Sequence, residues 1–128
     1  MNKFVMEPSS KTPLIDFDLS NGTLKIKGRS IPENSIEFYK PLMEALKTYT
    51  AEVKPTTTAT IQLEYFNTAS SKAVLEVFKH LENIKEKGSN VTLNWNYEEG
   101  DLDMKEAGED YQVMTTLHVT MVEVPEES

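Results

Sequence analysis

Hydrophobic and polar positions alternate along several parts of the chain, and this pattern predicts half-buried β-strands. In Thr57–Phe66, polar Thr, Gln and Glu alternate with Ala59, Ile61, Leu63 and Tyr65. The same alternation recurs in 91–97 and in Thr115–Glu123. A period of two places apolar side chains on one face of a strand and polar side chains on the other. We therefore expect helices on one face of a sheet, and a solvated opposite face rich in Thr, Asn and Gln.

Apolar residues at helical spacing fill the stretches between these strands. The first stretch follows Asn34, which is suited to cap a helix with Glu37 as its partner. Pro41 lies inside this stretch and predicts a kink or restart near 38–40, because proline lacks a backbone donor. A second stripe ends near 87–88 and consists of Val74, Val77, Phe78, Leu81 and Ile84. Asp101–Tyr111 is expected to form a short acidic helix or turn.

A hairpin precedes the first helix. Leu14–Asp18 and Thr23–Gly28 flank Asn21-Gly22, a pair that readily adopts the positive φ angles of a tight turn. The element order is therefore ββαβαβαβ, and its right-handed crossovers imply largely parallel pairing in the second half. We predict one α/β domain over residues 12–124, with a mixed, mainly parallel sheet of about five strands and helices on one face. Residues 1–11 and 125–128 are expected to be flexible termini.

Composition and charge narrow the function classes. The 128 residues include no cysteine, which excludes disulfides and thiol chemistry and suits a reducing cytoplasm. The net charge is −8, and it is unevenly distributed: residues 1–96 hold 12 Lys and Arg against 11 Asp and Glu, whereas 97–128 hold one Lys against 10 Asp and Glu. Such an acidic balance argues against nucleic acid as a partner. The absence of a long apolar run argues against a membrane span.

The sequence offers few groups for catalysis. His80 and His118 are the only histidines, and no zinc-protease, phosphate-loop or dinucleotide motif occurs. We therefore predict no catalytic residue, no metal site and no cofactor. The acidic segment 98–110 lacks the spacing of a calcium loop. Helix capping or a charged docking surface accounts for this segment better than metal binding, or than an enzyme that uses Asp101 and Glu106.

Hydroxyl side chains gather where a strand is predicted to end and a helix to begin, in the stretch YFNTASSK at 65–72. Backbone N–H groups and the positive end of the helix dipole converge at such a junction, which favours a phosphorylated hydroxyl. Serine, threonine and asparagine are also the preferred helix caps, so the same cluster is explained by capping alone.

Several short motifs together resemble the SiaC family of small bacterial regulatory phosphoproteins over about residues 12–120. They occur in the same order along the chain: TP at 12–13, GRSIPEN at 28–34, FY-x-PL at 38–42, YFNT-x-SSK at 65–72, W-x-Y at 95–97 and D-x-DM-x-EAGED at 101–110. The resemblance implies a STAS-like fold and a non-enzymatic partner switch. It implies phosphorylation of Thr68 by a serine/threonine kinase, reversal by a PP2C-type phosphatase, and a diguanylate cyclase as the target of the unphosphorylated form. The output would be cyclic di-GMP signalling, which favours aggregation and biofilm formation.

The expected docking surface joins the Thr68 region to the neighbouring turn. It comprises Asn67, Ser70, Ser71, Lys72, Arg29, Ser30, Pro32, Glu33 and Asn34. Position 69 is alanine where the family is associated with serine, which leaves the acceptor Thr68 intact. Arg29 can bind a carboxylate or phosphate bidentately, or be an ordinary surface residue. Two other functions stay open: a small-ligand binding module, and a partner switch with a different target protein.

Overall fold

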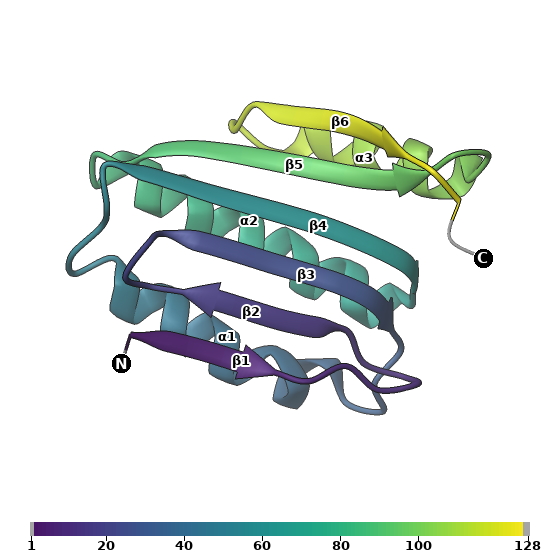
Figure 1. Ribbon diagram of the computed structural model, residues 1–128, viewed down its shortest axis with the longest axis horizontal. Coiled ribbons are helices and arrows are strands. Elements are labelled where there is room, and N and C mark those ends of the chain that lie inside the picture. The colour runs from purple at the N-terminus through teal and green to yellow at the C-terminus, as the bar shows by residue number, and fades with distance from the viewer. Residues whose placement is uncertain (1, 127–128) are drawn as a thin grey trace.

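The computed structural model describes residues 2–126, which fold into one six-stranded sheet and three helices (Figure 1). The elements in chain order are β1 Lys3–Met6, β2 Leu14–Asp18, β3 Thr23–Ser30, α1 Ser35–Tyr49, β4 Thr56–Phe66, α2 Thr68–Glu86, β5 Asn90–Glu98, α3 Leu102–Met114 and β6 Val119–Val124.

The strands lie in the sheet in the same order as in the chain, from β1 to β6. β1, β2 and β3 pair antiparallel, and β3 to β6 pair parallel. All three helices cover one face of the sheet (Figure 1), as expected when successive right-handed crossovers join parallel neighbours. The predicted one-layer, mixed and mainly parallel α/β fold is confirmed.

The number of strands and the state of the N-terminus differ from the prediction. Lys3–Met6 forms a sixth strand on the edge of the sheet, with Phe4 opposite Phe17 of β2. Phe4 and Met6 pack against the core, which explains why this short segment is ordered. The prediction of a flexible segment over 1–11 is therefore wrong for these four residues. At the other end β6 stops at Val124, and residues 127–128 of the predicted flexible terminus lie outside the described residues.

The helix boundaries follow the capping residues. Asn34 caps α1, because its side-chain oxygen accepts the Glu37 backbone N–H at 3.1 Å. α1 continues through Pro41, so the predicted restart does not occur. Pro41 is exposed, and water can bond the carbonyl that proline leaves without a donor. At the C-terminal end, the last strand begins at Val119 rather than at Thr115.

A β-bulge at the end of β4 changes the direction of the side chains before α2. The β3–β4 register pairs Gly28 with Leu63 but Arg29 with Tyr65, so Glu64 is an extra residue on β4. Tyr65 consequently points outward and is 54% exposed. Phe66 takes its place toward the core and lies edge-on to Trp95 at 6.3 Å between ring centroids. The alternating pattern alone predicted Tyr65 on the buried face. That prediction is wrong because the bulge reverses the direction of the side chains after Glu64.

Candidate docking and phosphorylation site

The ends of β3 and β4 bring the two predicted docking segments together. Ser30 pairs with Phe66 in the sheet, and the Asn67 backbone N–H donates to the Ser30 carbonyl at 3.2 Å. The turn that follows β3 therefore lies beside the start of α2. The structure confirms that residues 29–34 and 67–72 are neighbours, as the sequence predicted.

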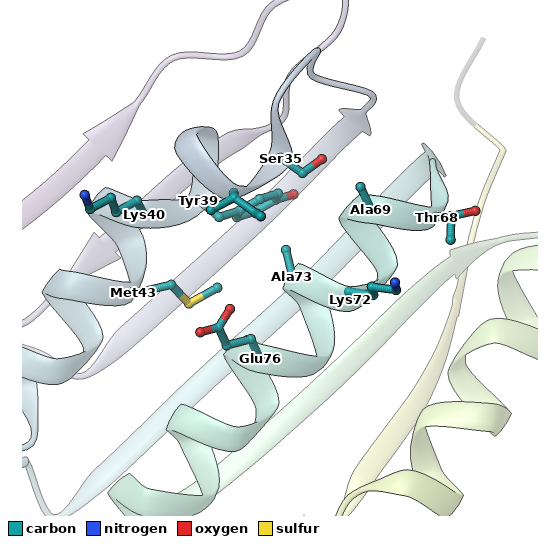
Figure 2. A pocket seen from close by; sticks show the side chains of 10 residues that line it. Ser35, Tyr39, Lys40, Met43, Thr68, Ala69, Lys72, Ala73 and Glu76 are labelled. Carbon is teal, nitrogen blue, oxygen red and sulfur yellow. The ribbon is translucent and has the colours of Figure 1, made fainter.

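Thr68 is the first residue of α2, and it is exposed. Asn67 caps the helix through its side-chain oxygen, which accepts the Ser70 backbone N–H at 2.8 Å. The Thr68 side chain points away from the gap between α1 and α2 (Figure 2). Its hydroxyl is thus accessible to an enzyme at the positive end of a 19-residue helix. A phosphate there would gain from the helix dipole and from Lys72, one turn further along α2.

Two of the predicted contact residues are not on the surface. Ser30 and Ser70 are fully buried, where Ser30 Oγ donates to Ser70 Oγ at 2.9 Å. Ser70 Oγ also lies 3.1 Å from Ser35 Oγ, and Ser30 Oγ lies 2.6 Å from the Tyr39 hydroxyl. These four hydroxyls satisfy one another, as buried polar groups must. The assignment of Ser30 and Ser70 to a partner-binding surface is corrected: they join the ends of β3, α1 and α2 from inside.

Tyr39 is held firmly by this cluster. Burial raises the pKa of the Tyr39 hydroxyl, and the hydrogen bond with Ser30 partly opposes that shift. The hydroxyl therefore stays protonated under all ordinary conditions and serves as a structural hydrogen-bonding group. Tyr39 in turn sets the position of the first two turns of α1 beside α2.

The other predicted contact residues lie at the surface. Arg29, Glu33, Asn34 and Lys72 are exposed, whereas Pro32, Asn67 and Ser71 are half-buried. Asn34 and Asn67 use their side-chain oxygens as helix caps. Ser71 donates its hydroxyl to the Thr68 carbonyl at 2.7 Å. The side chains best placed to reach a partner are therefore Thr68, Lys72, Arg29 and Glu33.

A groove between α1 and α2 is the feature that the sequence did not reveal. Its volume is about 690 Å³, and it is lined by residues of both helices, Ser35, Ile36, Tyr39, Lys40, Met43, Thr68, Ala69, Lys72, Ala73 and Glu76 (Figure 2). Ile36 precedes Tyr39 by three residues and Met43 by seven, which is the spacing of an apolar helix stripe, yet Ile36 is 80% exposed. The sequence feature that could have indicated this groove is the pair Ala69 and Ala73, because small residues one turn apart leave room beside a helix.

Within residues 2–126, no three His, Asp or Glu side chains gather closely enough to hold a metal ion. Asp101 caps α3 by accepting the Met104 backbone N–H at 3.0 Å, which accounts for one carboxylate of the acidic segment. Partial burial lowers the pKa of His80, and His118 is exposed. No helix between residues 2 and 126 is both long and apolar enough to cross a membrane.

Comparisons with known proteins agree with this geometry. SiaC of Pseudomonas aeruginosa, 25% identical in sequence, superposes with a TM-score of 0.87 over 97% of this chain and 100% of its own. A crystal structure of the diguanylate cyclase SiaD in complex with its activator SiaC from that bacterium also matches, with 25% identity, a TM-score of 0.87 and coverage of 94% of this chain and 99% of the matched one. An uncharacterised protein of P. aeruginosa strain UCBPP-PA14 is 29% identical over 104 residues, which are 81% of this chain and 82% of that protein.

A family model provides the assignment. The model for SiaC family regulatory phosphoproteins matches residues 6–124, nearly the whole of the part that the structure describes. The match includes α1, α2, the exposed Thr68 and the groove beside it. The chain therefore belongs to the SiaC family of regulatory phosphoproteins.

Proposed function

We propose that this chain is a non-enzymatic partner switch that is controlled by reversible phosphorylation of Thr68. In its unphosphorylated form it binds and activates a diguanylate cyclase, and so raises cyclic di-GMP. A serine/threonine kinase adds the phosphate and a PP2C-type phosphatase removes it. The switch acts in the cytoplasm, whose reducing conditions suit a chain without cysteine.

The observation that carries this proposal is the position of Thr68. It is an exposed hydroxyl at the start of α2, at the edge of a groove, in a chain of a phosphoprotein family. SiaC, the matched protein in the complex with SiaD, is described as the activator of that cyclase. This chain shares the fold of that SiaC, with a TM-score of 0.87, which supports an equivalent role toward a cyclase of its own cell.

Phosphorylation would change the docking surface through charge. A phosphothreonine carries about −1.5 to −2 charges and three acceptor oxygens. A partner that covers Thr68 must either remove water from this dianion, which is costly, or pair it with cations of its own. A surface that fits a neutral hydroxyl has no such cations in place. Because Thr68 is outside the core, the fold does not need to change for binding to be lost.

The test uses purified proteins of the bacterium that makes this chain. Its diguanylate cyclases are assayed one at a time for conversion of GTP to cyclic di-GMP, with wild type, Thr68→Ala or Thr68→Asp. We expect Thr68→Ala to bind and activate one cyclase like wild type, and Thr68→Asp to bind it at least about tenfold more weakly. Thr92→Asp adds the same charge at an exposed position of β5 and should leave activation unchanged.

Phosphate incorporation tests the site independently. With the cognate kinase and ATP, wild type should become phosphorylated and Thr68→Ala should not. Equal incorporation into Thr68→Ala would show that the acceptor is another residue. If Thr68→Asp activates the cyclase as strongly as wild type does, the switch is refuted. If the wild-type chain binds none of the cyclases, its target is a different protein.

A further inference from the structure

The four buried hydroxyls beneath the start of α2 form a chain of hydrogen bonds with one direction. Each hydroxyl has a single hydrogen to donate. Ser30 Oγ gives its hydrogen to Ser70 Oγ at 2.9 Å, so the Tyr39 hydroxyl must be the donor in its 2.6 Å contact with Ser30. Ser70 has no other acceptor among the described residues, and it donates to Ser35 Oγ at 3.1 Å. The chain therefore runs from Tyr39 through Ser30 and Ser70 to Ser35.

This hydroxyl chain connects the three segments that surround Thr68. Ser30 is the last residue of β3, Ser35 is the first residue of α1, and Ser70 lies in the first turn of α2. Tyr39, one turn further along α1, points from that helix toward α2 (Figure 2). The chain adds directional bonds to the apolar packing of these elements, and so it fixes where the start of α2 lies relative to β3 and α1.

Burial makes each bond of the chain important. Ser30 and Ser70 are fully buried, and Tyr39 is 1% exposed. Water cannot replace a lost partner at such positions, so breaking one bond leaves a buried polar atom unsatisfied. A shift of the first turn of α2 relieves this most easily, because Ser70 is the first buried residue of that helix.

A shift of Ser70 would displace Thr68 as well. The Asn67 side-chain oxygen accepts the Ser70 backbone N–H at 2.8 Å, and the Asn67 carbonyl accepts the Ser71 backbone N–H at 3.0 Å. The Ser71 hydroxyl donates to the Thr68 carbonyl at 2.7 Å. These bonds join residues 67–71 into one unit, in which Ser70 is bonded to the interior and Thr68 is exposed.

We infer that Ser70 is a positioning residue, which through the hydroxyl chain holds Thr68 in the place where a kinase transfers phosphate to it. The inference rests on the proposed function, since it concerns the phosphorylation of Thr68. In the transfer, Thr68 Oγ1 bonds to the γ-phosphorus of ATP, the bond from that phosphorus to the oxygen of ADP breaks, and the hydroxyl proton passes to a base of the kinase. The attacking and leaving oxygens must lie in line, and a misplacement of about 1 Å can slow a reaction about 100-fold.

A second hydroxyl cluster at the opposite end of the sheet provides a matched control. Thr57 Oγ1 lies 2.6 Å from Ser89 Oγ and 2.8 Å from the Tyr49 hydroxyl. Ser89 is 3% exposed, so Ser89→Ala removes a buried and bonded hydroxyl, as Ser70→Ala does. Thr57 lies at the start of β4, whereas α2 follows the other end of that strand. The surroundings of Thr68 should therefore be intact in Ser89→Ala.

The first test measures phosphorylation of Thr68 by the cognate kinase with ATP, on variants that urea denaturation shows to be folded. We expect Ser70→Ala to lower kcat/KM at least about tenfold, and Ser89→Ala to change it by less than about twofold. Ser30→Ala should act like Ser70→Ala although 40 positions separate the two residues. The double variant Ser30→Ala/Ser70→Ala should be no slower than the slower single variant, because each substitution breaks the same chain.

The second test is backbone hydrogen exchange, which needs no partner protein. The amides of Ser70 and Ser71 both donate to Asn67, and their exchange reports opening of the first turn of α2. We expect these two amides to exchange at least about fivefold faster in Ser30→Ala than in wild type, and at an unchanged rate in Ser89→Ala. Unchanged exchange in Ser30→Ala would overturn the inference.

The two proposals fail in distinguishable ways. If no kinase phosphorylates Thr68 of the wild-type chain, the switch is wrong, and hydrogen exchange alone decides on the positioning by Ser70. If wild type is phosphorylated and Ser70→Ala reacts as fast or faster, the switch stands and the positioning inference is wrong. If Ser70→Ala does not fold, Ser30→Ala and Tyr39→Phe remove other members of the same chain, and the same loss of kcat/KM is expected.

Discussion

Thr68 and Ser70 are two residues apart and have opposite surroundings. Thr68 is exposed, whereas Ser70 is fully buried and bonded to Ser30 and Ser35. A kinase can reach only the first hydroxyl without unfolding the start of α2. At the scale of single residues, the proposed choice of Thr68 over Ser70 as the phosphosite therefore follows from which side of the first helical turn each residue occupies.

Gly108 is required by the packing of Trp95. A Cβ built on Gly108 would lie 2.7 Å from Met121 Cε and 2.7 Å from Trp95 Nε1, with Trp95 Cδ1 closer still. Trp95 is fully buried and donates to the Met104 carbonyl at 2.9 Å, so its ring cannot easily move. In a helix Ala gains about 1 kcal/mol over Gly, but overpacking costs about 1–3 kcal/mol. The overpacking cost should prevail.

We predict that Gly108→Ala lowers the free energy of unfolding by up to about 2 kcal/mol, measured by urea denaturation. Glu106→Ala, at an exposed position of the same helix, should change it by less than about 0.5 kcal/mol. A Gly108→Ala variant as stable as wild type would show that Trp95 and Met121 repack freely around the added methyl group.

At the scale of elements, Glu82 of α2 fixes the segment between α3 and β6. Its Oε2 accepts from Thr115 Oγ1 and the Thr116 backbone N–H, each at 2.8 Å, and from Thr116 Oγ1 at 3.1 Å. This attachment explains why the last strand starts at Val119 although the alternating pattern begins at Thr115. The Thr116 backbone N–H is the main reason that the pKa of Glu82 is lowered, and burial opposes it.

The lowered pKa of Glu82 predicts a dependence of stability on pH. A carboxyl with a folded pKa below its ordinary value of 4.5 stabilises the fold above that value, and the contribution is lost as pH falls through the folded pKa. At pH 7 we expect Glu82→Gln to be less stable than wild type by about 1 kcal/mol, a figure reduced for solvent exposure. The difference should shrink below pH 4.5, as followed by urea denaturation at several pH values. A difference that is constant with pH would exclude the charge as its source.

Sequence reasoning succeeded where a local pattern determines the structure, and failed where a contact between distant residues does. Alternation and capping residues located β4, α2 and the Asn34 cap. The bulge at Glu64 was invisible because it depends on the register with β3. Ser30 and Ser70 were assigned to the docking surface because they lie in the Thr68 region and in the neighbouring turn. Their burial depends on a bond between two residues that are 40 positions apart. The α1–α2 groove likewise arises only when two helices are placed side by side.

At the scale of the whole molecule, the helix layer carries the candidate docking features and the opposite sheet face is polar. Thr58, Thr60, Gln62 and Asn94 lie on that face at half-buried positions. The charge is divided as well: the acidic excess of 97–128 belongs largely to α3 and its flanks, whereas the α1–α2 groove carries Lys40 and Lys72. A partner approaching the helix layer therefore meets two differently charged surfaces on either side of α2.

The edge strand β1 completes the sheet, and a matched pair of substitutions tests whether it does so in solution. Phe4 faces the core opposite Phe17, whereas Val5 faces outward opposite Asp16 and is 45% exposed. Threonine suits a strand at either position, so Phe4→Thr and Val5→Thr differ mainly in the apolar area lost from the core. We expect Phe4→Thr to lower the free energy of unfolding by about 1–2 kcal/mol, since Phe4 is only partly buried, and Val5→Thr to leave it nearly unchanged.

Without a paired β1, the edge of β2 would be free to pair with another chain, so Phe4→Thr should also increase self-association in light scattering. Equal stability of the two variants would mean that Lys3–Met6 does not pair with β2 in solution.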